Sequence, residues 1–206
     1  MKKYIMTFAV ILLISLTGCV PEINEIFVDE ATIIQDLFKS KDSVVYLYGE
    51  PHPIRLYPFG EIVKAEEERA SFVIFVESYP SFSIEQQNNL LRLTSNFDLP
   101  SDSPSMFMEI TQIADITVEE AERQIKSEID LDLYELFRND ATEDFPFNSI
   151  HLYERELLWN AKIISIYIRD NGRGGVFVIT TQHSEEAHLA GTRFRHYIST
   201  LEIIDK

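Results

Sequence analysis

Apolar and polar side chains alternate along several stretches of the chain. In residues 105–113, Met106, Met108 and Ile110 fall on one face of an extended chain. The other face holds Phe107, Glu109 and Thr111. A period of two is typical of a half-buried β-strand. Similar runs, rich in β-branched and aromatic residues, predict strands at residues 44–48, 54–57, 71–77, 149–155, 158–169, 175–182 and 200–204.

A second pattern, with apolar residues three or four positions apart, predicts helices. Thr117 and Glu120 have the spacing of a capping box, which begins a helix, and so do Ser83 and Gln86. The predicted helices span residues 29–40, 83–95, 117–130 and 184–199. In the third helix we expect Val118, Ala121, Ile125 and Ile129 to be buried, and Glu119, Glu122, Arg123, Lys126 and Glu128 to be solvated.

Glycine and proline mark where these elements end. Gly49 and the run Pro51-His52-Pro53 are predicted to stop the first strand. Asn171-Gly172 lies between two β-rich runs, and both residues tolerate positive φ, which is a strong signal for a hairpin. Strands joined by a hairpin pair antiparallel. We therefore predict an α+β fold in which helices flank an antiparallel sheet.

The second half of the chain resembles the PsbP-like fold of plant photosystem subunits and many bacterial lipoproteins. The matching pieces are Phe107-Met108-Glu109-Ile110 leading into Thr117-Val118-Glu119-Glu120-Ala121, the hairpin through Asn171-Gly172, the runs 176–180 and 185–187, and the ending 198–204. Near its start the family has a Pro-x-x-Trp turn, where this chain has Tyr57-Pro58-Phe59-Gly60 without the tryptophan. The resemblance implies a binding or assembly module and brings no catalytic residues.

The N-terminal segment has the features of an export leader. Lys2 and Lys3 precede an uncharged run at residues 6–16, which is too short to cross a bilayer as a helix. The run ends in Leu16-Thr17-Gly18-Cys19, which resembles the lipobox of bacterial lipoproteins. In that family the cysteine thiol is joined to a diacylglycerol and the chain is cleaved before it. The alternative is a plain secretory leader with an incidental cysteine.

This resemblance implies cleavage between Gly18 and Cys19 and a lipidated Cys19. It divides the chain into a lipoprotein signal peptide over residues 1–18, a tether over 19–28 and a single α+β domain over 29–206. Two acyl chains give stable membrane anchoring where one gives marginal binding. We expect the protein to be held at the cell membrane, facing outside the cytoplasm.

Charge and cysteine content narrow the functions of the domain. The leader holds two of the 18 basic residues and none of the 34 acidic ones, so the rest of the chain has a formal charge of −18. Such a domain is repelled by nucleic-acid phosphates and by anionic lipid head groups. Cys19 is the single cysteine, which excludes an internal disulfide and a cysteine nucleophile in the domain.

The sequence offers little catalytic chemistry. His183 and His188 are five positions apart, or about 140° around a helix, so one metal ion does not easily bind both. The Gly-x-Ser-x-Gly motif of hydrolases is absent, and the glycines at 172–175 precede a strand, whereas a phosphate site needs a helix there. We predict no enzyme activity, no metal and no cofactor.

Aromatic and basic residues are the better candidates for binding. Trp159, Tyr153 and Tyr167 lie near one another in sequence, and Arg193 and Arg195 form a basic pair in an acidic chain. Alternatively, Trp159 belongs to the core and the arginines pair with glutamates. The expected function is a non-enzymatic lipoprotein that binds a protein partner or serves as an assembly module. The alternative function is small-ligand binding in an aromatic-lined pocket between the sheet and the helices.

Overall fold

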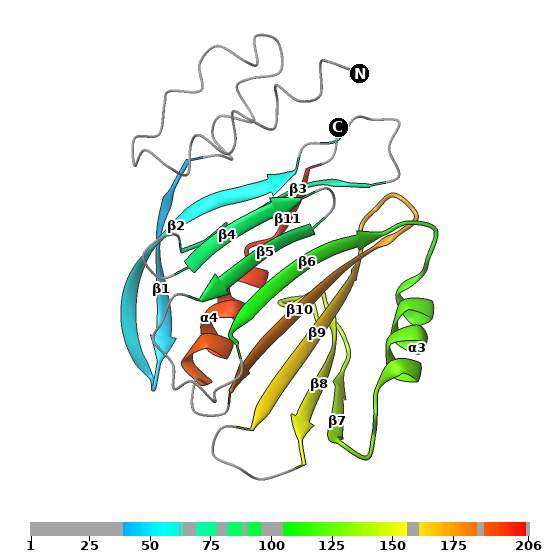
Figure 1. The fold of residues 1–206 in the computed structure, drawn as a ribbon. Helices are drawn as coiled ribbons and strands as arrows, with labels where there is room; N and C mark the ends of the chain where they lie inside the picture. The colour runs from blue at the N-terminus through cyan, green and yellow to red at the C-terminus, as the bar shows by residue number, and fades with distance from the viewer. Residues whose placement is uncertain are drawn as a thin grey trace. The chain divides into compact units, whose positions relative to one another are not determined.

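The computed structural model describes residues 39–61, 63, 69–77, 82–87, 90–95, 105–155, 161–184 and 188–204 (Figure 1). Within these ranges, eleven strands and two helices form, and the strands build two antiparallel sheets. The predicted α+β, PsbP-like class with helices flanking an antiparallel sheet is therefore wrong. Strands dominate the described residues because several segments that the sequence assigned to helices or turns pair as strands.

The smaller sheet has the strand order β1-β2-β3-β11. Its strands are β1 (Lys41–Leu47), β2 (Glu50–Glu61), β3 (Ser71–Val76) and β11 (Glu202–Ile204). The prediction that Pro51-His52-Pro53 stops a strand is wrong, because β2 continues through both prolines. Leu47 pairs with Glu50 to close a two-residue turn, so alternate residues of β2, including both prolines, direct their backbone nitrogens away from β1.

The larger sheet has the order β4-β5-β6-β10-β9-β8-β7. Its strands are β4 (Phe82–Gln87), β5 (Leu90–Ser95), β6 (Phe107–Ile113), β7 (Tyr134–Asn139), β8 (Asn148–Glu154), β9 (Lys162–Asp170) and β10 (Val176–Ser184). The predicted hairpin at Asn171-Gly172 is confirmed, because Asp170 pairs with Val176 across the loop. Strand β7 was not predicted from the sequence.

The predicted helix over residues 83–95 is also wrong. This segment forms the antiparallel strands β4 and β5. Leu91 and Leu93 are buried, and Arg92 between them forms an ion pair with Glu109 of the neighbouring strand β6. The capping-box spacing of Ser83 and Gln86 therefore does not produce a helix here. The segment forms strands because Leu91 and Leu93, two positions apart, both reach the core from a strand.

The helix predicted at residues 117–130 is confirmed as α3 (Val118–Glu128). The backbone nitrogen of Glu120 donates to the Thr117 hydroxyl, and the Thr117 nitrogen donates to the Glu120 carboxylate, so the capping box is complete. The other described helix is α4 (His188–Ile198), inside the predicted range 184–199. Of the predicted helix at 29–40, residues 29–38 lie outside the described residues.

The solvated position predicted for Glu122 is wrong. Its side chain is buried, and its carboxylate accepts hydrogen bonds from Arg138 of β7 at 3.0 and 3.2 Å and from Asn148 of β8 at 2.9 Å. Lys126 donates a further bond at 3.2 Å. The helical spacing places Glu122 beside the buried stripe, and the sheet supplies the partners that make its burial tolerable.

Aromatic side chains join the two sheets and α4. Phe72 of β3 packs edge-on against Phe177 of β10, with ring centroids 5.2 Å apart. Phe82 of β4 contacts both Phe194 and Tyr197 of α4, with centroids 5.8 Å apart in each case. All five rings are buried, so this cluster forms the core between the sheets.

Candidate functional site

The two faces of the larger sheet differ in how they are covered near its β7 edge. Helix α3 covers one face, where Ala121 packs with Ile150, Leu152, Ile166 and Ile168 (Figure 1). These strand residues have even numbers in β8 and β9. Because side chains alternate along a strand, the odd-numbered residues of β8 and β9 point to the opposite face.

Helix α4 lies on that opposite face, at strand β10. A Cβ atom added to Gly191 would lie 2.5 Å from Nε2 of His183, so the helix backbone approaches this buried histidine closely. Helix α4 contacts β10, β1 and β3. At β7 the same face is exposed to solvent, and the side chains there are the candidates for an interaction surface.

Three apolar side chains form this surface, which we call the open patch: Leu133, Phe137 and Tyr153. Glu135 pairs with Tyr153 across the two strands, so Tyr153 shares a face with Leu133 and Phe137, two residues to either side of Glu135. Phe137 and Tyr153 pack edge to face, with ring centroids 5.4 Å apart. Their exposed fractions are 48% and 41%, and that of Leu133 is 57%.

A chain of hydrogen bonds lies beside the open patch on the same face. His151 is bonded through Nε2 to the Ser149 hydroxyl at 3.1 Å and through Nδ1 to the Ser165 hydroxyl at 2.8 Å. Burial lowers the pKa of His151, and the positive charge of Arg195 lowers it further, so both favour the neutral imidazole. Both serines are buried, so neither hydroxyl is presented to a substrate, and the arrangement is structural.

Two more of the predicted binding residues, Tyr167 and Arg195, belong to this region. The Tyr167 ring is buried and packs edge-on against His151 and Phe145, with centroids 5.8 and 5.7 Å away. Burial raises the pKa of its hydroxyl. The Arg195 guanidinium lies 4.9 Å from the centroid of Phe145. The fold therefore brings Tyr153, Tyr167 and Arg195 to one face, with Tyr153 exposed and Tyr167 buried.

Arg193 has a different environment. Its guanidinium forms an ion pair with Glu77 after β3, and the Tyr197 hydroxyl donates to the same carboxylate oxygen. Burial opposes the charge of Arg193, but the hydrogen bond with Glu77 outweighs burial and raises its pKa. Burial also raises the pKa of Tyr197. Pairing with a glutamate, the alternative weighed for the arginines, is thus the arrangement found at Arg193.

The structure does not describe the remaining predicted site residues. Trp159, Gly18 and Cys19 lie outside the described residues. Conversely, Leu133 and Phe137 were not singled out from the sequence. The available signal was the period of two from Leu131 through Leu133 to Phe137, but Glu135 interrupts it and it follows a predicted helix directly.

The border of the open patch is acidic. Residues 128–144 contain one basic side chain, Arg138, which forms ion pairs with Glu122 and, at 2.6 Å, with Asp140. The same segment carries seven exposed carboxylates, Glu128, Asp130, Asp132, Glu135, Asp140, Glu143 and Asp144. Outside this segment, Nε of Arg155 donates to the Leu131 and Tyr134 carbonyls, and Arg195 lies near His151, so the border carries both signs with carboxylates in the majority.

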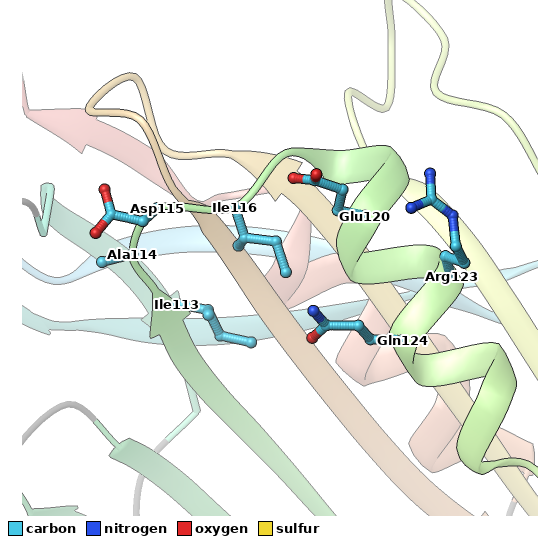
Figure 2. Close-up of a pocket in the computed structure, with 7 residues that line it drawn as sticks. All are labelled: Ile113, Ala114, Asp115, Ile116, Glu120, Arg123 and Gln124. Atoms are coloured by element: carbon cyan, nitrogen blue, oxygen red, sulfur yellow. The ribbon is translucent and has the colours of Figure 1, made fainter.

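Two hollows lie elsewhere on the larger sheet. The first, of about 370 Å³, is lined at the β6–α3 junction by Ile113, Ala114, Asp115, Ile116, Glu120, Arg123 and Gln124. Figure 2 shows that its polar side chains point in different directions and do not converge on one point. The second, of about 440 Å³, lies between the start of α3, the end of β9 and Ile203. Neither hollow is lined by an aromatic residue, in contrast to the pocket expected for a small ligand.

Metal and membrane features can be assessed for the described part of the chain. His183 is buried, with Nδ1 2.9 Å from the backbone oxygen of Ser184. Among the described residues, no group of three histidine, cysteine, aspartate or glutamate side chains could hold a metal ion. In the same residues, neither helix has the length and apolar composition needed to cross a bilayer.

The chain has few similarities to known proteins. No protein-family model matches the chain, and no curated protein matches it in sequence. Among solved structures, the chain is similar to the Ran-binding protein Mog1p of Saccharomyces cerevisiae, at 12% sequence identity and a TM-score of 0.45. The match covers 81% of this chain and 97% of Mog1p. Similarity at this level assigns neither a fold family nor a partner to the chain.

Proposed function

We propose that this protein is a lipid-anchored, extracytoplasmic module without enzymatic activity that binds another protein through the open patch. The observation that carries the proposal is the exposed pair Phe137 and Tyr153. Aromatic residues are enriched at the centres of protein interfaces, because they bury a large area with few rotatable bonds. Leu133, in the turn just before β7, extends the apolar area.

The support beneath the patch favours a preformed binding surface. Tyr167 and Ser149 are buried next to the partly exposed His151, and His151 is hydrogen-bonded on both ring nitrogens. A surface held by such a network loses little conformational freedom on binding, which improves affinity.

The location is proposed from the lipobox. In a lipoprotein, the diacylglycerol on Cys19 would hold the domain at the outer surface of the membrane through the tether expected over residues 19–28. The acidic domain would be repelled by anionic head groups, and this repulsion would keep its surface available to a partner.

Site-specific photo-crosslinking tests this function. A benzoylphenylalanine replaces Phe137 in the full chain, expressed in its own host with the leader intact. The matched control replaces Tyr46 of β1, which is also exposed and lies on the smaller sheet. We expect irradiation to yield a discrete protein adduct from position 137 and none from position 46, and we expect Tyr153→Ser to weaken the adduct.

Two outcomes would contradict the proposal. Adducts of the same mass and yield from both positions would indicate random collisions at the membrane. No protein adduct from position 137, in cells where the control chain is expressed and exported equally, would show that the open patch is not a protein-binding surface.

A further inference from the structure

Strand β7 is an edge strand, and no other described strand pairs with its outer side. It ends the order of the larger sheet. Its register with β8 runs one to one from Tyr134 to Asn139, so no bulge twists the edge away. The strand contains neither proline nor lysine, the residues that proteins commonly place on an edge to prevent pairing. Strand β7 therefore presents a straight template from Leu136 onward, whereas at its start Tyr134 already donates to the Asp130 carbonyl and accepts from Nε of Arg155.

The register identifies the backbone groups on that edge. The nitrogen of Arg155 donates to the carbonyl of Leu133 at 2.9 Å, so Leu133 directs its carbonyl toward β8. Directions alternate along a strand, so Glu135 and Phe137 also direct their backbone groups toward β8. Leu136 and Arg138 consequently direct theirs to the outer side. An added strand would bond to these two residues.

The charge of the edge selects the occupant. Residues 128–144 carry seven exposed carboxylates, and the basic side chains beside them are Arg138, already paired with Glu122 and Asp140, and Arg155, whose Nε donates to the Tyr134 carbonyl. A second copy of this chain would bring two such acidic borders together, and like charges placed opposite each other on paired strands are destabilising. A segment rich in lysine or arginine would instead neutralise the border.

We infer that β7 receives an extended basic segment of the partner protein as an additional strand of the sheet. This inference rests on the proposed function, since it names the chemistry of the partner at the same patch. Side chains on one face of the added strand would meet Leu133 and Phe137, so apolar residues suit those positions. On the same face, lysine or arginine suits the position beside Glu135, and basic residues at the two ends of the segment would face the carboxylates of residues 128–132 and 140–144. The opposite face would meet Leu136 and Arg138, so uncharged residues suit those positions. Main-chain bonds give affinity in this mode, and the alternating side chains give specificity.

A set of three capped peptides tests the inference on the purified domain. The first peptide has about nine residues, a common strand length, with lysine at its centre and at both ends and valine elsewhere. The second replaces each lysine with glutamate. The third has the sequence of the first, but every second backbone nitrogen, on the edge that would face β7, is methylated. Methylation keeps the charge of the peptide and removes the backbone donors needed for strand pairing. We expect the first peptide to bind at least about tenfold more tightly than either of the others.

Hydrogen exchange identifies where the first peptide binds. We expect the amides of Leu136 and Arg138 to exchange at least about tenfold more slowly when the peptide is bound, because they become hydrogen-bonded. The amide of Phe137 already points toward β8, so its exchange changes less. A peptide held by charge alone would slow neither Leu136 nor Arg138 selectively.

Each result bears on a distinct claim. Equal binding of the methylated and unmethylated lysine peptides would overturn strand addition, and so would protection of amides away from β7. Equal binding of the glutamate peptide would overturn the basic partner. The crosslink from position 137 is a separate measurement. If the crosslink forms but the peptides do not bind, the inference of an added strand is wrong and the proposed function still stands.

Discussion

The ring of Tyr153 packs edge-on against Phe137, at an interplanar angle of 89° and a centroid distance of 5.4 Å. The two residues belong to different strands and are diagonal neighbours on one face, since Tyr153 pairs with Glu135 and Phe137 pairs with His151. Both rings keep more than a third of their surface exposed. The arrangement fixes the geometry of two aromatic side chains at a surface without burying them.

A double-mutant cycle on this pair tests its energy. We expect Phe137→Ser and Tyr153→Ser to interact by about 0.5–1 kcal/mol in the free energy of unfolding, the usual range for aromatic cross-strand neighbours. Urea unfolding of the two single variants and the double variant measures the interaction. Tyr46→Ser combined with Tyr153→Ser is the control, with strictly additive effects expected. Additivity for Phe137 and Tyr153 as well would mean that the contact contributes nothing.

The buried Glu122 carboxylate makes the free energy of unfolding depend on pH in the acidic range. Burial raises its pKa, but the hydrogen bonds from Arg138, Lys126 and Asn148 outweigh burial, and the pKa falls below its ordinary value of 4.5. A carboxyl with a lowered pKa in the folded state stabilises the protein above its unfolded pKa and loses this contribution as the pH falls. We therefore expect the stability from Glu122 to be complete above about pH 5 and to decline below pH 4.5.

The variant Glu122→Gln separates this effect from general acid unfolding. It should lose about 1.5–3 kcal/mol at pH 7, the range for hydrogen bonds to a charged group, and show a smaller further loss below pH 4.5. Urea unfolding at pH 7 and pH 4 measures both quantities. Glu119→Gln, on the exposed side of the same helix, should unfold like the parent protein. A parent and a Glu122→Gln variant with the same pH dependence would contradict the assignment.

Protonation of His151 should also destabilise the fold. Burial, followed by the charge of Arg195, holds its pKa below 6.5. A histidine with a lowered pKa stabilises the folded state above the unfolded pKa, and this contribution is lost as the pH falls from 6.5. We expect His151→Gln to reduce the stability difference between pH 7.5 and pH 5.5. The resonance of the imidazole gives the direct check, and a titration midpoint at or above 6.5 would contradict the prediction.

Gly60 is required for the close approach of β2 and β3. A Cβ atom at this position would lie 2.0 Å from the backbone oxygen of Phe72, and a backbone oxygen inside a sheet cannot move aside. We expect Gly60→Ala to lower the free energy of unfolding by about 1–3 kcal/mol or more. Thermal unfolding measures the loss of stability. The comparison variant is Ala114→Gly, the reverse substitution at a partly buried bend. A variant as stable as the parent would show that the strands separate without cost.

The membrane anchor is tested at Cys19. Since it is the single cysteine, Cys19→Ala removes the thiol that a diacylglycerol would modify and leaves the rest of the leader unchanged. We expect the variant to leave the membrane fraction or to accumulate as the uncleaved precursor. Labelling with a radioactive fatty acid should mark the parent protein and not the variant. The lipoprotein assignment would be wrong if the variant is labelled, or if it is cleaved and stays in the membrane fraction like the parent protein.

Local sequence signals succeeded where neighbouring residues complete the interaction. Thr117 and Glu120 cap α3 through bonds that span three residues, so the capping box could be identified without the fold. Asn171 accepts hydrogen bonds from the nitrogens of Arg173 and Gly175, which holds the predicted hairpin loop. The same reasoning failed for Ser83 and Gln86, because pairing between β4, β5 and β6 decides the conformation there.

By itself, the sequence determined the acidic charge, the single cysteine, the capped helix α3, the hairpin at Asn171 and the alternation in β6, since each depends on composition or on residues close along the chain. Only the tertiary structure decided that Glu122 is buried and that β7 forms an edge. It also decided that Tyr153 and Arg195 approach one face while Arg193 pairs with Glu77. These features depend on side chains brought together from distant segments, and the positions of such segments follow from packing the whole core.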